Sequence, residues 1–350
     1  MQSSIEIAGR RIETGLPCYV IAELSANHNQ SLAEALELIR LAKDCGADAV
    51  KIQTYTPDTL TLDCDDEYFR IGKGTIWEGK NLYQLYGEAF TPWEWHADLF
   101  AHAKETGITL FSTPFDETAV DLLEKLGAPA YKIASFELVH LPLIRRVART
   151  GKPMIMSTGM GSRDEIGEAV AAAREAGCRE LALLKCTSAY PAPPEEANLR
   201  TIPHLANEFG VPAGLSDHTM GSAVAVASAC LGGCIIEKHF TRSRAVPGPD
   251  SVFSMEPAEF KSMVADIRTA EKALGRVGFE LTAGEQASRI FRRSIFVVQD
   301  IPSGGPITPE NVRIIRPGHG LAPRHWEAVL GKKAKRALRR GKPLNEEDLQ

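Results

Sequence analysis

Two histidines follow two consecutive predicted strands, each at the point where the apolar run ends. His218 comes after a Val-Pro-Ala-Gly-Leu run, and His239 comes after a Cys-Ile-Ile run. Neighbouring parallel strands deliver such residues to one rim of a sheet, a few ångströms apart. Two satisfied core histidines are the plain alternative, but the matching positions favour a shared divalent cation. Two imidazoles leave most coordination positions open, as a catalytic ion requires, and the nearby carboxylates of Glu237 and Asp250 suit Mn2+ or Mg2+.

Two lysines lie inside otherwise apolar predicted strands, Lys51 in the second strand and Lys132 in the fourth. Lysine is rarely buried without a purpose, although a packed stem whose ammonium reaches solvent is the plain alternative. Hydrogen-bond donors stand at the ends of the same and nearby strands: Gln53, Thr113, Ser135, Ser157 and Ser216. This ring of donors predicts a site for an anionic substrate that carries a phosphate or a carboxylate.

Acidic residues also stand at the ends of predicted strands. Glu23 and Glu137, after the first and fourth strands, could orient a sugar hydroxyl or move a proton. Either could equally be an ion-pair partner of one of the two lysines, and both interpretations stay open. Asp217, beside the first histidine, is expected to orient that imidazole rather than bind the ion itself.

The elements that must position these residues alternate between strand and helix. Eight predicted strands, each followed by a helix, fill about the first 275 residues, and the polar clusters lie where the strands end. This pattern indicates a (β/α)8 TIM barrel, whose active sites lie at the C-terminal ends of the strands. A doubly wound open sheet is the alternative, but no glycine-rich dinucleotide turn follows the first strand. A long irregular insertion over 54–91 interrupts the alternation and is expected to cover a site.

The strand–helix alternation ends after about Gly275, and this change of pattern predicts two domains. Residues 1–280 form the barrel, 281–293 a linker, and 294–350 a small β-rich domain that contains a basic run. A domain of about 60 residues has little core of its own, so we expect it to dock on another surface.

Composition narrows the classes of function. The chain has 350 residues, of which 44% are hydrophobic and 24% charged, and a net charge of -5 gives no electrostatic footprint for nucleic acid. Its seven cysteines are odd in number and scattered in apolar patterns, which suits reduced core thiols better than a disulfide framework. No apolar run is long enough to cross a bilayer, and the N-terminus has no apolar signal core. We therefore expect a cytoplasmic enzyme with no nucleic-acid or membrane partner.

Ordered motifs along nearly the whole chain resemble those of the N-acylneuraminate (sialic acid) synthase family. The motifs are Ile21-Ala22-Glu23, Lys51-Ile52-Gln53, Ser112-Thr113-Pro114-Phe115, Ser157-Thr158-Gly159-Met160, Gly214-Leu215-Ser216-Asp217-His218 and Glu237-Lys238-His239. The tail from about Ser294 is similar to the antifreeze-like (SAF, β-clip) domain of that family. Its members condense phosphoenolpyruvate with an amino-sugar aldehyde to give a nine-carbon α-keto acid and phosphate.

The resemblance implies a role for each candidate residue. The residues that would hold phosphoenolpyruvate are Lys51, Gln53, Thr113, Lys132, Ser135, Ser157 and Ser216. The cation would be held by His218 and His239, and the residues that would face the sugar are Glu23, Tyr190 and Asp250. The family also implies a domain-swapped homodimer in which Arg316 of one tail reaches the partner's sugar site. Glu137 is our candidate for the group that handles the proton of the attacking water.

Departures from the family pattern indicate its pseudaminic acid synthase branch. Ser188 stands where sialic acid synthases usually have Asn, and the segment 74–86 replaces their glycine-asparagine turn, which leaves one phosphate ligand unassigned. The aromatic character of that segment fits 2,4-diacetamido-2,4,6-trideoxy-altrose better than the more hydroxylated N-acetylmannosamine. Two alternatives stay open: a synthase for N-acetylmannosamine or the legionaminic acid precursor, and a non-catalytic carbohydrate-binding barrel.

Overall fold

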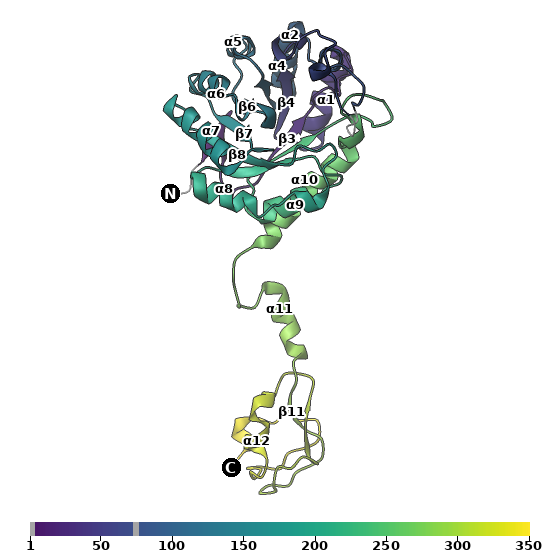
Figure 1. The fold of residues 1–350 in the computed structure, drawn as a ribbon. Coiled ribbons are helices and arrows are strands. Elements are labelled where there is room, and N and C mark those ends of the chain that lie inside the picture. The colour runs from purple at the N-terminus through teal and green to yellow at the C-terminus, as the bar shows by residue number, and fades with distance from the viewer. Residues whose placement is uncertain (1–3, 73–76) are drawn as a thin grey trace. The chain divides into compact units, whose positions relative to one another are not determined.

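Parallel strands form a closed barrel surrounded by helices (Figure 1). The computed structural model describes residues 4–72 and 77–350. The barrel strands are β3 (Tyr19–Glu23), β4 (Ala49–Thr54), β5 (Thr109–Pro114), β6 (Tyr131–Ile133), β7 (Met154–Ser157), β8 (Leu181–Cys186), β9 (Ala213–Asp217) and β10 (Ile235–His239). Each strand pairs with the next, and β10 closes the ring by pairing with β3. The predicted TIM barrel is confirmed.

One main helix follows each strand and packs on the outside of the barrel. These helices are α1 (Leu32–Asp44), α4 (His96–Thr106), α5 (Glu117–Lys125), α6 (Leu141–Ala148), α7 (Arg163–Glu175), α8 (Thr201–Phe209), α9 (Ala223–Cys230) and α10 (Pro257–Leu274). Helix α7 illustrates the local causes: Ser162 caps its first turn, and its apolar stripe, which includes Ala169 and Val170, is buried against strands β7 and β8. The helices thus hold the strand ends in a fixed ring.

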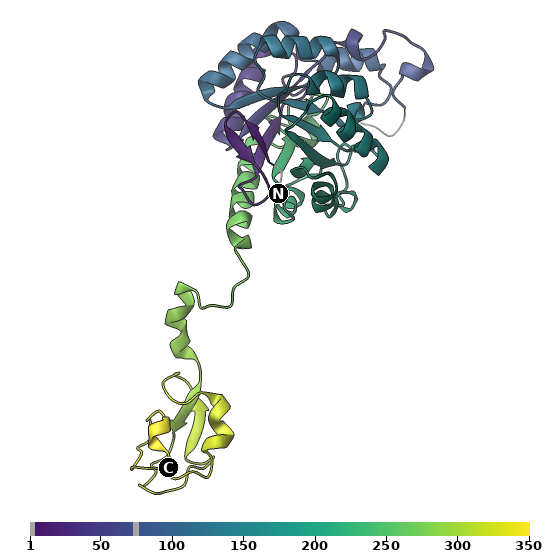
Figure 2. The ribbon, with the colours of Figure 1, turned by 90° about the vertical axis from the view of Figure 1, so that its left-hand side faces the viewer.

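A short hairpin at the N-terminus fills one end of the barrel interior (Figure 2). Its strands are β1 (Ile5–Ile7) and β2 (Arg10–Ile12), and their isoleucines join the interior cluster that contains Tyr19 and Ile235. The sequence patterns did not predict this hairpin, because strands of three residues are too short to show a periodicity. This end of the barrel is therefore closed by apolar side chains.

The insertion over 54–91 is partly helical, so the prediction of a wholly irregular loop was wrong. It contains α2 (Pro57–Leu60) and α3 (Leu82–Ala89). Asn81 organises the second helix, because its side chain accepts from Tyr83 N–H at 2.7 Å while its amide donates to Cys64 O at 2.7 Å. Residues 74–76 of the predicted aromatic segment lie outside the described residues.

Residues 276–350 form a second compact unit. The strands β11 (Ser294–Val297) and β12 (Val312–Ile315) pair antiparallel, and a short helix, α12 (Trp326–Val329), contributes to a separate apolar core. This small β-rich domain was predicted. Helix α11 (Ala283–Ser288) lies within the segment predicted as a linker. In the described part of the chain, no helix has both the length and the apolar character needed to span a bilayer.

Candidate active site

The alternation of side chains along β9 and β10 decides which residues enter the barrel. Ile235 belongs to the interior cluster, whereas Ile236 packs outside among the helices, so Glu237 and His239 follow Ile235 inward. Lys238 points outward, where it pairs with Asp217 of the neighbouring strand at 2.6 Å. Adjacent residues of β10 therefore serve different roles: Glu237 and His239 belong to the site, and Lys238 belongs to the scaffold.

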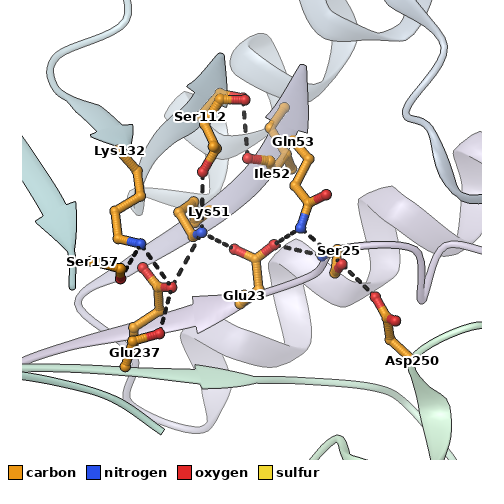
Figure 3. A network of polar contacts seen from close by, with 12 residues as sticks. Glu23, Ser25, Lys51, Ile52, Gln53, Ser112, Lys132, Ser157, Glu237 and Asp250 are labelled. Carbon is orange, nitrogen blue, oxygen red and sulfur yellow. Dashed lines mark hydrogen bonds and ion pairs between the residues drawn. The ribbon is translucent and has the colours of Figure 1, made fainter. Parts of the chain in front are cut away.

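A buried cluster of two lysines and two glutamates occupies the interior at the C-terminal ends of the strands (Figure 3). Lys51 Nζ lies 2.9 Å from Glu23 Oε2 and 3.2 Å from Glu237 Oε1. Lys132 Nζ lies 3.4 Å from Glu237 Oε1. Glu23 and Glu237 come from neighbouring strands; Glu23 pairs with Lys51 of the adjacent strand β4, whereas Glu237 reaches Lys51 and Lys132 on strands that do not pair with β10. Both predicted lysines thus point inward, and neither reaches solvent.

The predicted hydroxyl residues surround these charges. Lys51 Nζ donates to Thr113 Oγ1 at 3.1 Å, Lys132 Nζ donates to Ser157 Oγ at 2.6 Å, and Ser216 Oγ donates to Glu237 Oε1 at 3.2 Å. The structure therefore brings together the lysines and hydroxyls that the sequence placed at separate strand ends.

Ser135 and Ser188 meet at Gly159. Gly159 N–H donates to Ser135 Oγ at 3.1 Å. A Cβ atom at Gly159 would lie 2.3 Å from Ser188 Oγ and 2.6 Å from Ser135 Oγ, so only glycine allows both hydroxyls to approach the backbone. The two serines flank the turn that links β7 to α7.

The electrostatics of the cluster are asymmetric. Burial raises the pKa of Glu23, whereas for Glu237 the opposing effects of Lys132 and Lys51 outweigh burial and lower the pKa to about 2. Burial lowers the pKa of Lys132, but for Lys51 the two glutamates outweigh burial and raise it. Lys51 and Glu237 are thus a firmly ionised pair, and Lys132 is the cation with less compensation.

The two histidines lie together, as predicted, with ring centroids 5.4 Å apart. His218 Nδ1 lies 2.8 Å from Thr187 O, and because a carbonyl only accepts, this nitrogen carries a proton; in the neutral imidazole Nε2 is then the nitrogen that can bind an ion, although burial is outweighed by the interaction with Cys186, which raises the pKa of His218. His239 Nδ1 is buried and has no hydrogen-bond partner among the described residues. Burial and the nearby His218 lower the pKa of His239, so its imidazole is neutral and can act as a ligand.

Asp217 does not orient His218, and that prediction was wrong. The carboxylate of Asp217 faces the outside of the barrel, where it accepts from Thr219 N–H and binds Lys238. The backbone carbonyl of Thr187 supplies the bond that the sequence analysis assigned to Asp217. Within residues 4–72 and 77–350, no group of three or more His, Cys, Asp or Glu side chains is arranged to hold a metal ion.

Cys186 is a residue of the site that the sequence analysis treated as a core thiol. Its Sγ lies 3.9 Å from His218 Nδ1 and 3.9 Å from Ser188 Oγ. Burial would raise the pKa of Cys186, but the hydrogen bond and charge of His218 outweigh it and lower the pKa to about 6. The inward alternation of Ala182 and Leu184 along β8 was the signal that could have placed this thiol inside the barrel.

A cavity of about 370 Å³ opens beside the charged cluster. Its polar residues belong to the barrel strands and loops: Ser25, Gln53, Glu137, Tyr190, His239 and Asp250. The other lining residues are mostly apolar and come largely from the insertion: Tyr55, Leu60, Ile71, Trp77, Leu82, Leu85, Tyr86 and Ala89. The predicted role of the insertion as a cover over a site agrees with this geometry.

Two carboxylates that line this cavity, Glu137 and Asp250, have no lysine partner among the described residues. Burial raises the pKa of Glu137 to about 7, and its Oε2 has no hydrogen-bond partner within the described part of the chain. Burial also raises the pKa of Asp250, although the hydroxyl of Ser25 opposes the shift. Tyr190 stacks on His218 with ring centroids 4.3 Å apart, which brings the cavity next to the histidine pair. Arg316 lies in the second unit, in the loop after β12, and is exposed.

The fold and the site define a (β/α)8 barrel in which paired lysines, hydroxyls and a histidine pair adjoin a cavity with one polar and one apolar side. The chain belongs to the NeuB family, whose model matches residues 38–278, and a SAF domain follows at residues 292–350.

Named relatives sharpen this assignment. The chain is 44% identical to the pseudaminic acid synthase of Helicobacter pylori over 95% of its length and 98% of that protein. It is 37% identical to the N,N'-diacetyllegionaminic acid synthase of Legionella pneumophila, over 95% of this chain and 94% of that protein. The crystal structure of an N-acetylneuraminic acid synthetase from Leptospira borgpetersenii matches with a TM-score of 0.73 and 30% identity, over 82% of this chain and 95% of that one.

Proposed function

We propose that the chain is a pseudaminic acid synthase that condenses phosphoenolpyruvate with 2,4-diacetamido-2,4,6-trideoxy-altrose and water to give pseudaminic acid and phosphate. The cavity carries this proposal, because apolar residues of the insertion and polar groups of the barrel line it together, beside a buried lysine and hydroxyl cluster. Identity supports the same choice of sugar, since it is higher with the pseudaminic acid synthase than with the legionaminic acid synthase.

The lysine cluster is suited to the phosphoenolpyruvate anion. Lys51 and Lys132 converge from neighbouring parts of the barrel, and Thr113 and Ser157 lie within hydrogen-bond distance of their ammonium groups. Because the lysines are buried, charge-assisted bonds to a phosphate or a carboxylate are stronger there than in water. Lys132 is the less compensated cation and is the first candidate to bind the incoming anion.

A divalent ion fits the histidine pair. The buried and unpartnered Nδ1 of His239, together with the fixed tautomer of His218, leaves two imidazole nitrogens able to bind one ion, Mn2+ or Mg2+. Synthases of this family are generally metal-dependent. When bound, such an ion supplies Lewis-acid polarisation of the aldehyde oxygen.

The chain's own residues account for the remaining steps. Lys51 and Lys132 hold phosphoenolpyruvate so that its C3 faces the aldehyde carbon, and Asp250 and Tyr190 orient the open-chain sugar. As the C3–carbon bond forms, positive charge develops at C2, and water adds there. Glu137, whose pKa lies near 7, accepts the proton of that water. The tetrahedral adduct then loses phosphate, and the C2 oxygen becomes the keto group.

The apolar wall favours a deoxy sugar with acetamido groups. Leu60, Ile71 and Leu85 offer no hydrogen bonds to a C6 hydroxyl, but they can bury a C6 methyl group and acetyl methyl groups. A hydroxyl buried there without a partner would lose its hydration, at a cost of about 1–3 kcal/mol. N-acetylmannosamine, which carries that hydroxyl, is therefore expected to be a poorer substrate.

Phosphate release tests the proposal directly. Purified protein with phosphoenolpyruvate is assayed against the trideoxy-altrose, the legionaminic precursor and N-acetylmannosamine, each with and without a chelator. We expect turnover with the trideoxy-altrose that the chelator removes. Strong turnover with N-acetylmannosamine alone would replace the proposed substrate, and no release with any sugar would favour a carbohydrate-binding barrel.

We also propose that the protein acts as a domain-swapped homodimer. Residues 1–275 carry 26 Lys and Arg against 37 Asp and Glu, whereas residues 276–350 carry 14 against 8, so the two units have opposite net charge. Exposed apolar residues in the loops at the C-terminal ends of the strands, Phe136, Met160 and Val252, offer a surface that a second copy's tail could cover. Arg316 would then reach the partner's sugar site.

The seven free cysteines support a reducing compartment, in accord with the predicted cytoplasmic location.

Complementation between two inactive variants tests the swap. A Lys51→Met protomer lacks a working barrel, and an Arg316→Ala protomer lacks the tail arginine. If tails swap, mixed dimers regain activity, because one intact barrel receives an intact Arg316. If the tail serves its own barrel, mixing restores nothing.

A further inference from the structure

Ser25 has an unusual backbone for a serine at the mouth of the barrel. It lies two residues after the end of β3, is buried, and lines the cavity. Its φ of 44° lies in the left-handed region, which residues other than glycine adopt uncommonly. Such conformations cost free energy and gather at functional sites, so this residue calls for a functional explanation.

The hydrogen bonds around Ser25 determine which group receives its hydroxyl proton. Its N–H donates to Glu23 Oε1 at 3.1 Å, and its Oγ accepts from Gln53 Nε2 at 2.9 Å. Gln53 Nε2 also donates to Glu23 Oε1 at 3.0 Å, so both amide hydrogens are engaged. The single hydroxyl proton of Ser25 is then left for the short bond to Asp250 Oδ2 (Figure 3).

These hydrogen bonds hold the Asp250 carboxylate through one of its two oxygens. Oδ2 receives the Ser25 hydroxyl and, at 3.4 Å, the Ala26 N–H, whereas neither donor reaches Oδ1. A donor bond of this kind favours the ionised carboxylate. The preceding residue is held from the insertion, because Trp77 Nε1 donates to Pro249 O at 2.9 Å. Asp250 is therefore oriented between β3 and the insertion, with one oxygen available to a guest in the cavity.

We propose that Ser25 is a positioning residue of the sugar site, whose hydroxyl holds Asp250 as an acceptor for an O–H or N–H donor of the amino sugar. The left-handed backbone is what places the Ser25 N–H on Glu23 and its hydroxyl on Asp250 at the same time. This inference rests on the proposed function, because it assigns the donor to the amino-sugar substrate rather than to phosphoenolpyruvate.

Two substitutions at this position separate the hydroxyl from the backbone. Ser25→Gly removes the hydroxyl but accepts a positive φ without strain, whereas Ser25→Ala removes the hydroxyl and keeps the strain. Both variants are expected to raise the KM for the amino sugar by about 10- to 100-fold, since a hydrogen bond to a charged group is lost. The KM for phosphoenolpyruvate is expected to stay unchanged. Thermal unfolding should show Ser25→Gly to be at least as stable as Ser25→Ala.

The outcomes distinguish the two levels of the proposal. If Ser25→Gly behaves like the wild type while Ser25→Ala is impaired, the backbone and not the hydroxyl matters, and the inference is overturned. An active wild type whose sugar KM is unchanged in both variants overturns the inference alone. A wild type that releases no phosphate with any amino sugar overturns the proposed function and this inference together. In a double variant with Asp250→Asn, loss of the hydroxyl should add nothing further.

Discussion

Two buried lysine–carboxylate groups lie back to back across strand β10, and they differ in how completely they are satisfied. Outside, Lys238 is closed off by Asp217 and the carbonyl of Thr219. Inside, Lys51 and Lys132 share Glu237, and the carboxylate lies 3.4 Å from Lys132 Nζ, whose shorter bond is to the neutral hydroxyl of Ser157.

The difference teaches what separates a scaffold charge pair from a binding site. The outer pair matches one lysine to one carboxylate. Lys238 also donates to the carbonyl of Thr219, and Asp217 accepts from the N–H and the hydroxyl of Thr219, so the pair offers nothing to a ligand. The inner cluster has hydroxyls on its cations, and its two lysines share one carboxylate, Glu237, beside a cavity. Burial alone does not mark a functional lysine, but incomplete pairing beside a cavity does.

Removing Lys51 gives the largest expected change. Lys51→Met should lower kcat/KM by about 10²- to 10³-fold, because a preorganised cation is lost from a buried site. The fold should survive, because burial already raises the pKa of Glu23 and this carboxyl can take up a proton. Phosphate-release kinetics and circular dichroism on the same sample measure both quantities. Unchanged activity in a folded variant would remove the distinction between the two groups.

Removing Lys238 should have the opposite profile. Lys238→Met leaves Asp217 buried without its cation and should destabilise the protein by about 3–5 kcal/mol in urea unfolding. The folded fraction should keep its kcat/KM, because Lys238 points away from the cavity. A Lys238→Met, Asp217→Asn double variant serves as the control and should recover part of the stability. A loss of kcat/KM as large as that of Lys51→Met would show that the outer pair also serves the site.

Asp217 and His218 are adjacent in the chain but face opposite sides of the barrel wall, so substitutions at the two positions should differ in their effect on metal binding. His218→Ala should weaken Mn2+ binding by at least about 100-fold, whereas Asp217→Asn should leave it nearly unchanged, since Thr187 O orients the imidazole. Calorimetric titration of the apoprotein with Mn2+ measures both affinities. Equal losses in the two variants would restore the predicted role of Asp217 as an orienting group.

The smallest expected effect is a pH dependence within the inner site. If Glu137 accepts a proton in its ionised form, kcat/KM should rise with pH through an apparent pKa of about 7, and Glu137→Gln should abolish this rise. Because the folded-state pKa is raised above the ordinary value, the stability contribution of Glu137 is present at low pH and lost as the pH rises through about 7. Glu137→Gln should therefore gain stability relative to the wild type at pH 8 but not at pH 4. A profile with the same inflection in wild type and Glu137→Gln would assign the ionisation to another group.

The barrel and the strand ends could be predicted from the sequence, because a buried parallel strand gives an apolar run that ends in polar residues. That rule predicts Lys51, Lys132, His218 and His239 at one end of the barrel. It failed for the N-terminal hairpin and for the helices of the insertion, since segments of three to eight residues carry too little periodicity.

The sequence by itself determined the barrel, its family and the residue types that meet at the rim, because those depend on a repeating pattern of apolar and polar residues. Only the tertiary structure decided which side of a strand each residue near its end would face. Thus the structure places Asp217 outside the barrel, next to Lys238, and Cys186 inside it, next to His218. The tertiary structure alone also brought Ser25 against Asp250, residues separated by 225 positions in the chain, since closing the barrel joins loops that no local pattern connects.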